Sequence, residues 1–165
     1  MTANTTGENL AELVKRGGVS HDVSGNSPHE ILSNIIGNLP SFPPQKKEAL
    51  LRAVMEREAL ITTGIGRGIA LPHPRTPLLE EGEDPFVAVV FPQRPLDWNT
   101  LDGSKVHTIF LIVSKSAKQH LGALARINFL CQQEKFFNLI AAQAPGEEII
   151  AAIQEAESTW KNSER

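Results

Sequence analysis

One stretch decides how the rest of this chain is interpreted: Thr62-Thr63-Gly64-Ile65-Gly66-Arg67-Gly68-Ile69-Ala70-Leu71-Pro72-His73. Its glycines alternate with other residues, and the apolar run behind them predicts a strand that stops at Pro72 and delivers His73. Glycine permits positive φ and close backbone approach, so this loop could present its N–H groups to an anion held beside that imidazole. The same pattern also fits a plain turn before a core strand that ends in an incidental histidine.

A dinucleotide-binding site is not indicated by these glycines. Their spacing is G-x-G-x-G, and a strand-like run follows where the dinucleotide-binding fold opens a helix. No β-α-β pattern surrounds the loop. The glycines by themselves leave the choice between an anion site and a structural turn open.

The composition favours one domain that does not bind nucleic acid. The chain has 165 residues, a net charge of −3 and 21% charged residues, and its Lys and Arg form no single cluster. Cys131 is the only cysteine, which excludes an intrachain disulfide and a Cys-rich zinc site. The apolar runs are too short to span a membrane and the N-terminus carries no signal peptide, so we expect a cytoplasmic protein without direct membrane insertion.

Capping signals and hydrophobic periodicity predict helices mixed with short strands. We expect an α/β fold, a single domain whose mixed β-sheet is flanked by helices on both faces. The domain is predicted to span residues 9–158, between a flexible N-terminal tail at 1–8 and a polar C-terminal tail at 159–165. Helices are predicted at 10–16, 28–36, 44–58, 117–130 and 136–139 and from 146 onward, and strands at 19–23, 69–71, 86–91 and 106–113. The helix at 117–130 is expected to be anchored in the core by Leu121, Leu124, Ile127 and Leu130.

Two side chains outside the glycine stretch have the chemistry of an anion site. His120 falls in the first turn of the helix that Ser116 caps, where the helix N-terminus favours an anion and disfavours a protonated imidazole. Arg57 lies shortly before the glycines, where a guanidinium could reach a bound oxyanion. Each residue also has an ordinary explanation, as an exposed capping-turn histidine and as part of a solvated helix face. His21, His29 and His107 are interpreted as structural or exposed.

The chain resembles the fructose/mannitol-type (type 2) enzyme IIA domain of the bacterial phosphotransferase system, including its nitrogen-regulatory branch. The similarity runs from about residue 10 to 157. Arg57-Glu58, Thr63 to Gly66, and Gly68 to His73 resemble the family signature R-E-x4-T-G-I-G-x-G-[IV]-A-[IL]-P-H. Asp102-Gly103 with Val106, and His120-Leu121 with Leu124-Ala125, resemble the D-G-x2-V and H-L-x2-L-A segments.

This resemblance implies a phosphoryl carrier. His73 would accept the phosphoryl group from phosphorylated HPr or a paralogue of it, and pass it to a IIB domain or use it as a regulatory signal. His120 is implied as the supporting histidine and Arg57 as an active-site arginine. Phosphoryl transfer needs mostly positioning and charge neutralisation, so Thr63, Gly64, Gly66 and Gly68 are predicted to bind the phosphoryl group together with Arg57. Transfer between two histidines needs no metal and no cofactor.

Two alternatives stay open beside the transport carrier. The first is a regulatory binding module that has kept the fold and whose partner binding is switched by His73 phosphorylation. The second, a metal site of His73, His120 and a carboxylate, has little support because no H-E-x-x-H spacing or third ligand stands out. The carrier hypothesis requires both imidazoles in one shallow, solvent-open depression, and we expect an apolar rim around it that includes Ile65 and Leu71.

Overall fold

The computed structural model describes residues 9–40 and 42–163 of the chain. The predicted N-terminal tail and the last two residues of the predicted C-terminal tail lie outside the described residues. Six α-helices are described: α1 (Leu10–Gly17), α2 (Pro28–Gly37), α3 (Lys47–Leu60), α4 (Ala117–Gln132), α5 (Glu134–Ala141) and α6 (Gly146–Ser163). A short 3-10 turn, η2 (Pro44–Lys46), leads into α3.

One mixed sheet of five strands forms the centre of the molecule. Its strands are β1 (Val19–Val23), β2 (Gly64–Gly66), β3 (Ile69–Ala70), β4 (Phe86–Pro92) and β5 (Thr108–Val113), in the order β1-β4-β5-β3-β2. β1 runs parallel to β4 and β3 runs parallel to β5, whereas the β4–β5 and β2–β3 pairs are antiparallel. The mixed sheet confirms the predicted fold class.

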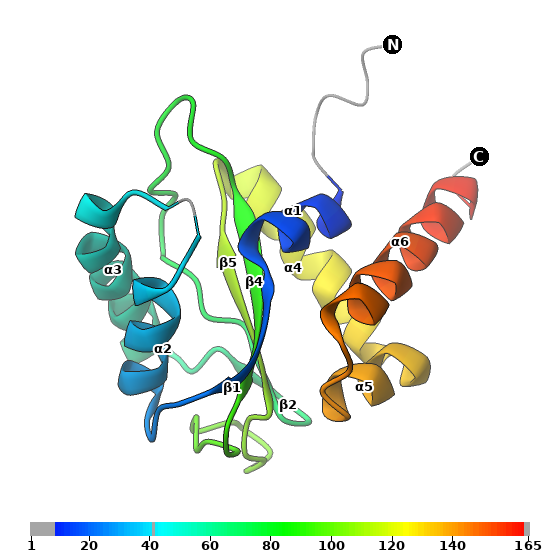
Figure 1. Ribbon diagram of the computed structural model, residues 1–165, viewed down its shortest axis with the longest axis horizontal. Coiled ribbons are helices and arrows are strands. Elements are labelled where there is room, and N and C mark those ends of the chain that lie inside the picture. The colour runs from blue at the N-terminus through cyan, green and yellow to red at the C-terminus, as the bar shows by residue number, and fades with distance from the viewer. Residues whose placement is uncertain (1–8, 41, 164–165) are drawn as a thin grey trace.

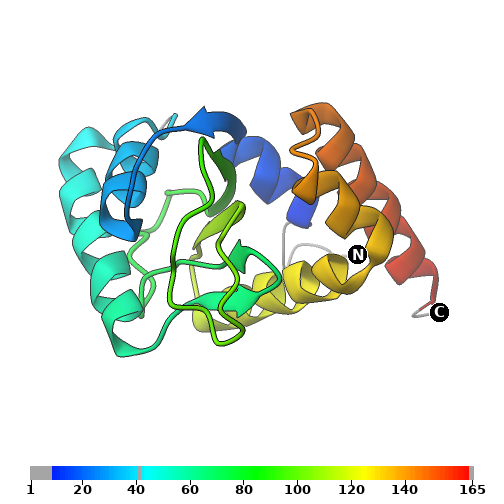
Figure 2. The ribbon, with the colours of Figure 1, turned by 90° about the horizontal axis from the view of Figure 1, so that it is seen from below.

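Helices cover both faces of this sheet, as expected (Figure 1). Side chains alternate along β4, so Val87, Val89 and Phe91 pack on the side of α1, α4, α5 and α6. Ala88 and Val90 pack on the other side, against α2 and α3. Figure 2 shows the same three layers from below, with α2 and α3 on one side and α5 and α6 on the other. β4 and β5 are buried along their full lengths, which explains their continuous apolar sequences.

The capping signals are confirmed in atomic detail. The hydroxyl of Ser27 accepts a hydrogen bond from the Glu30 amide (3.1 Å), and Ser116 caps α4 through the Gln119 amide at the same distance. Both serines hold the extended backbone expected of an N-cap. Ser116 thereby fixes the start of the helix that carries His120.

Two expectations about the elements are wrong. Leu121 was expected in the core but is 64% exposed, because it points away from the face of α4 that Ala123 and Ile127 bury. Strand β5 begins at Thr108, and Val106 instead forms an isolated bridge with Leu96.

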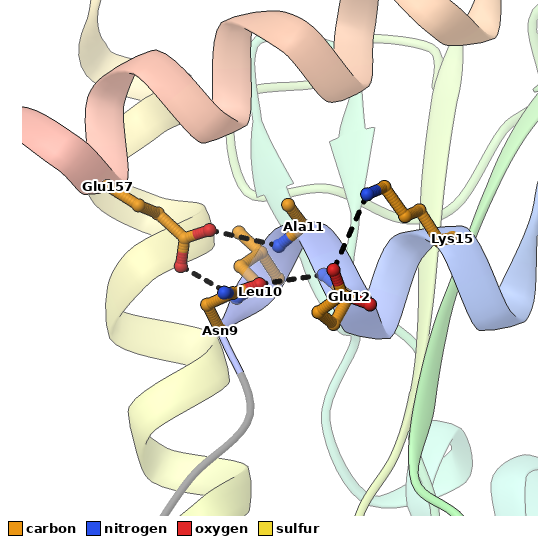
Figure 3. A network of polar contacts seen from close by, with 6 residues as sticks. All are labelled: Asn9, Leu10, Ala11, Glu12, Lys15 and Glu157. Atoms are coloured by element: carbon orange, nitrogen blue, oxygen red, sulfur yellow. Dashed lines mark hydrogen bonds and ion pairs between the residues drawn. The ribbon is translucent and has the colours of Figure 1, made fainter. Parts of the chain in front are cut away.

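A buried carboxylate joins the two ends of the described chain (Figure 3). Glu157 of α6 is 7% exposed and accepts hydrogen bonds from the amides of Leu10 (2.6 Å) and Ala11 (3.0 Å). These amides belong to the first turn of α1, where backbone N–H groups lack partners within the helix. Asn9 caps the next free amide, that of Glu12 (2.9 Å). Glu157 therefore caps α1 from 147 residues away in the sequence.

Candidate functional site

The fold brings His73 and His120 together. Their ring centroids lie 4.4 Å apart, with an angle of 46° between the ring planes. β3 and β5 are parallel neighbours, so the chain leaves both strands at the same edge of the sheet. His73 lies three residues past the end of β3, and His120 lies in the first turn of the helix that follows β5. Both side chains are half-buried, so part of each ring faces solvent, as the carrier hypothesis requires.

The backbone around His73 fixes which ring nitrogen is free. Nδ1 lies 2.7 Å from the carbonyl oxygen of Leu71, and because a carbonyl only accepts, Nδ1 carries the proton and donates. In the neutral ring Nε2 then holds the lone pair. The carbonyl of Pro72 accepts from the Ile112 amide of β5 (3.0 Å), and Pro74 is buried on the other side of the histidine. His73 is therefore presented from a firmly held segment with the lone pair of Nε2 free.

Both imidazoles are held neutral near pH 7. Burial lowers the pKa of His73 below its ordinary value of 6.5, and the charge of Arg57 lowers it further, against the opposing effects of the Leu71 carbonyl and Glu58. For His120, burial and the neighbouring His73 and Arg57 lower the pKa to about 4. A neutral imidazole is the nucleophilic form of histidine.

Arg57 lies close enough for its charge to act on both histidines. Its Nη1 donates to the carbonyl oxygen of Ile61 at the C-terminal end of α3 (2.7 Å). Within residues 9–40 and 42–163, no carboxylate forms an ion pair with this guanidinium. The described part of the chain thus leaves this positive charge without an ion pair, and it can attract an anion at the histidine pair.

The glycines do not form the expected anion cradle. Gly64–Gly66 is itself a strand, and it makes an antiparallel hairpin with Ile69–Ala70. The amide of Gly64 donates to Thr62 Oγ1 (3.0 Å), and that of Gly68 donates to Ser104 Oγ (3.0 Å). The intervening Arg67 amide donates to Asp102 (2.9 Å). These N–H groups are used inside the protein.

The tip of the hairpin is also far from His73. At about 3.3 Å per residue of extended chain, Gly68 lies roughly 16 Å from His73 along the strand. Gly68 has a φ of +83°, and a Cβ there would come within 2.2 Å of the His107 ring. This glycine is needed because His107 packs against the backbone and donates from Nε2 to the Arg67 carbonyl (3.1 Å). For Gly66 and Gly68 the turn explanation is the correct one.

Thr63 is likewise occupied by a protein partner. Its amide donates to Glu58 Oε2 (2.7 Å) and its hydroxyl donates to Glu58 Oε1 (2.5 Å). Glu58 lies near the site, and no role was predicted for it from the sequence. The signal for it was the Arg57-Glu58 pair of the family signature, which marks the position but not its hydrogen bonds.

The apolar rim differs from the expected one. Ile65 is 45% exposed, as predicted, but Leu71 is 2% exposed and belongs to the core. Exposed apolar side chains closer to the histidine pair are Leu121, which follows His120, and Ile61, whose carbonyl binds Arg57. A hollow of about 170 Å³ beside His120 is lined by Pro74, Pro77 and Leu121, among others.

Two further findings concern other classes of site. In the part of the chain that the structure describes, no three His, Cys, Asp or Glu side chains are grouped so that they could hold a metal ion. None of the described helices is both long and apolar enough to cross a bilayer. His21 and His107 make structural hydrogen bonds, His21 with the Ala144 carbonyl (2.9 Å) and His107 with Thr108 Oγ1 (2.7 Å).

Comparison with known proteins agrees with the geometry. Residues 12–156 match the family described as "Phosphoenolpyruvate-dependent sugar phosphotransferase system, EIIA 2". A "Nitrogen regulatory protein" of Bradyrhizobium diazoefficiens is 27% identical over 146 residues, which cover 87% of this chain and 94% of that protein.

Two solved structures share the fold. The nitrogen regulatory protein IIA-Ntr of Neisseria meningitidis superposes with a TM-score of 0.72 at 22% identity, covering 87% of this chain and 98% of that one. The mannitol enzyme IIA of Escherichia coli, solved in complex with phosphorylated enzyme IIB, gives a TM-score of 0.61 at 15% identity over 83% of this chain and 94% of that chain. The chain therefore belongs to the EIIA 2 family of the phosphoenolpyruvate-dependent sugar phosphotransferase system, whose members carry phosphoryl groups.

Proposed function

We propose that His73 accepts the phosphoryl group, from the phosphohistidine of an HPr-type carrier, and passes it to a IIB-type partner. The observation that supports this most directly is the hydrogen bond from His73 Nδ1–H to the Leu71 carbonyl, which leaves the Nε2 lone pair free. The reaction uses no cofactor and no metal. The compartment we propose is the cytoplasm, in keeping with a single cysteine that can form no intrachain disulfide.

The two imidazoles account for every bond and proton in the transfer, so no further acid or base is needed. The His73 Nε2 lone pair forms the new P–N bond while the donor's P–N bond breaks, and the donor imidazole leaves with that electron pair. If the donor ring carries a proton on its other nitrogen, it leaves as neutral imidazole. His73, which keeps its Nδ1 proton, becomes a phosphorylated imidazolium. The Leu71 carbonyl then stabilises the positive charge through its hydrogen bond from Nδ1–H, which becomes charge-assisted.

Arg57 and His120 supply charge and hydrogen bonding to the transferred group. The guanidinium of Arg57 has no carboxylate partner within the described residues, so it can neutralise the phosphoryl oxygens. His120 makes no ring hydrogen bond with the residues the structure describes, so its N–H can donate to the same oxygens. Gly64, Gly66, Gly68 and Thr63 contribute by shaping the hairpin rather than by binding the phosphoryl group directly.

Incubation with phosphorylated HPr tests this function. The wild-type chain is expected to gain one acid-labile phosphoryl group, and His73→Ala to gain none. His29→Ala is the matched control, because His29 is an exposed histidine in the first turn of α2. Full labelling of His73→Ala would overturn the assignment.

A regulatory role is the second candidate. The curated relative named above is a nitrogen regulatory protein, and the Neisseria nitrogen regulatory structure has a higher TM-score (0.72) than the mannitol structure (0.61). In this role phosphorylation of His73 switches the binding of a target protein. The two roles separate in one assay: rapid transfer from the phosphorylated chain to a purified IIB protein supports the carrier, and its absence supports the regulator.

A further inference from the structure

Glu58 is tied to the reactive histidine through three consecutive contacts. Its carboxylate accepts both polar hydrogens of Thr63, at 2.7 Å from the amide nitrogen and 2.5 Å from the hydroxyl oxygen. The Thr63 carbonyl accepts from the Leu71 amide (3.0 Å), and the Leu71 carbonyl accepts from His73 Nδ1–H (2.7 Å). A side chain on α3 is thereby connected to the ring that receives the phosphoryl group.

This connection acts through geometry rather than by polarising one bond through the next. The N–H and the C=O of any one residue belong to different peptide groups, so charge is not passed directly through Thr63 or Leu71. Instead, each contact fixes the position of the next group. The Glu58 carboxylate holds Thr63 in place. The Thr63 carbonyl then holds Leu71 in register, and the Leu71 carbonyl accepts the hydrogen bond from the imidazole.

The neighbouring residue anchors the same segment. Arg57 Nη1 donates to the Ile61 carbonyl (2.7 Å), so two successive residues of α3 hold the chain between Ile61 and Thr63. Thr63 is 5% exposed, and few water molecules can replace the carboxylate as its partner. An unpaired amide and hydroxyl at this depth would cost free energy, so the segment would shift when Glu58 is removed.

We propose that Glu58 is a positioning residue for phosphoryl transfer: it holds Leu71 so that His73 keeps its proton on Nδ1 and offers Nε2 to the donor. The proposal rests on the proposed function in that His73 is the accepting residue. It adds a residue that touches neither the phosphoryl group nor the imidazole. The charge of Glu58 has a second effect, since it raises the pKa of His73 in opposition to Arg57.

Two substitutions separate position from charge. Glu58→Gln keeps the size of the side chain and an oxygen that can accept from the Thr63 amide, but removes the charge. Glu58→Ala removes both. Glu56→Ala is the matched control, because Glu56 is an exposed glutamate on the same helix with no hydrogen bond to the site.

The tautomer of His73 is read from its ring ¹⁵N chemical shifts at pH 8, without any phosphoryl donor. We expect the Nδ1–H form in the wild type, Glu58→Gln and Glu56→Ala, and a mixture of tautomers in Glu58→Ala. Phosphorylation by phosphorylated HPr is then followed at several donor concentrations. Here kcat denotes the single-turnover rate constant of phosphorylation at saturating donor, and KM the half-saturating donor concentration. In Glu58→Ala we expect kcat to fall about tenfold with KM within a factor of about two, and Glu58→Gln to recover most of the rate.

The outcomes distinguish this proposal from the function on which it rests. An unchanged tautomer and an unchanged kcat in Glu58→Ala would overturn the positioning role, whether or not His73 is phosphorylated. If the wild type takes up no phosphoryl group, the proposed function fails, and the ¹⁵N shifts still decide whether Glu58 sets the tautomer. If Glu58→Ala does not fold, Thr63→Val is measured instead, because it removes the hydroxyl contact and leaves the amide contact in place. A wild-type tautomer ratio and kcat in Thr63→Val would then count against the proposal.

Discussion

Acidification is expected to weaken the native state through His120. Burial, together with the nearby His73 and Arg57, lowers the pKa of His120 from 6.5 to about 4. Between these two values the unfolded chain binds a proton that the native ring does not. The free energy of unfolding therefore falls as the pH falls from about 6.5 to about 4, because the unfolded state binds more protons in this window.

The size of the effect follows from the shift. A change from 6.5 to about 4, at 1.36 kcal/mol per pKa unit and discounted by half for the partly exposed ring, amounts to roughly 1.7 kcal/mol. His73 adds to the loss in the same direction, since burial lowers its pKa as well. Carboxylates that become protonated below pH 5 contribute to the same curve, so the comparison must be made against a variant.

Urea denaturation at pH 7.5, 6.5, 5.5 and 4.5 measures the effect. The wild type is expected to lose roughly 1.3 kcal/mol more than His120→Asn over this range, because the variant has no imidazole to protonate at residue 120 and pH 4.5 lies just above the native pKa of about 4. His29→Asn serves as the control and should follow the wild-type curve, since His29 is exposed. Parallel curves for the wild type and His120→Asn would refute the reasoning. An NMR titration of the His120 ring with a midpoint near 6.5 would refute it too.

Other predictions concern the packing around the site and the fold. Gly68→Ala should destabilise the protein by roughly 3 kcal/mol in urea titrations, because the added Cβ meets His107 at a backbone φ of +83°. Glu157→Ala should cost about 2 kcal/mol by leaving the first amides of α1 unpaired, whereas Glu155→Ala, which removes an exposed carboxylate of the same helix, should cost under about 0.5 kcal/mol. Burial raises the pKa of Cys131 to about 12, so its thiol should react with a disulfide reagent at pH 8 only when urea unfolds the chain.

The sequence predicted the elements because their signals are local, and it singled out His73 and His120, which the fold brings together. The N-cap hydrogen bonds of Ser27 and Ser116 join residues three positions apart, and both are confirmed. The side chains of Glu30 and Gln119 accept from the amides of Asn26 and Lys115, one residue before each cap, so the reciprocal bond of a capping box is not formed. The continuous apolar run of β4 predicted a strand buried on both faces, which is what the sheet contains. His73 was found because it ends a strand behind a recognisable motif, and its pairing with His120 followed from the family resemblance.

The role of the glycine stretch could not be predicted from local sequence alone. Alternating glycines are compatible with an anion cradle and with a tight hairpin, and the difference lies in what their amides bind. Here the Gly68 amide donates to Ser104 and the neighbouring Arg67 amide donates to Asp102, 36 and 35 residues further along the chain. No periodicity or propensity marks such partners in advance.

The amino-acid sequence by itself determined the fold class and the order of the elements, since these depend on neighbours within a few residues, and its contiguous motif pointed to His73 as the proposed phosphoryl acceptor. Only the tertiary structure decided which ring nitrogen of His73 is free and that Leu71 is buried in the core while Leu121 is exposed. It also decided that Glu58 accepts the hydrogen bonds of Thr63 beside the site. Each of these depends on hydrogen bonds and packing between elements that meet only in the folded chain. A sequence pattern gives the periodicity of a helix or strand, but it does not say which neighbour satisfies a given N–H.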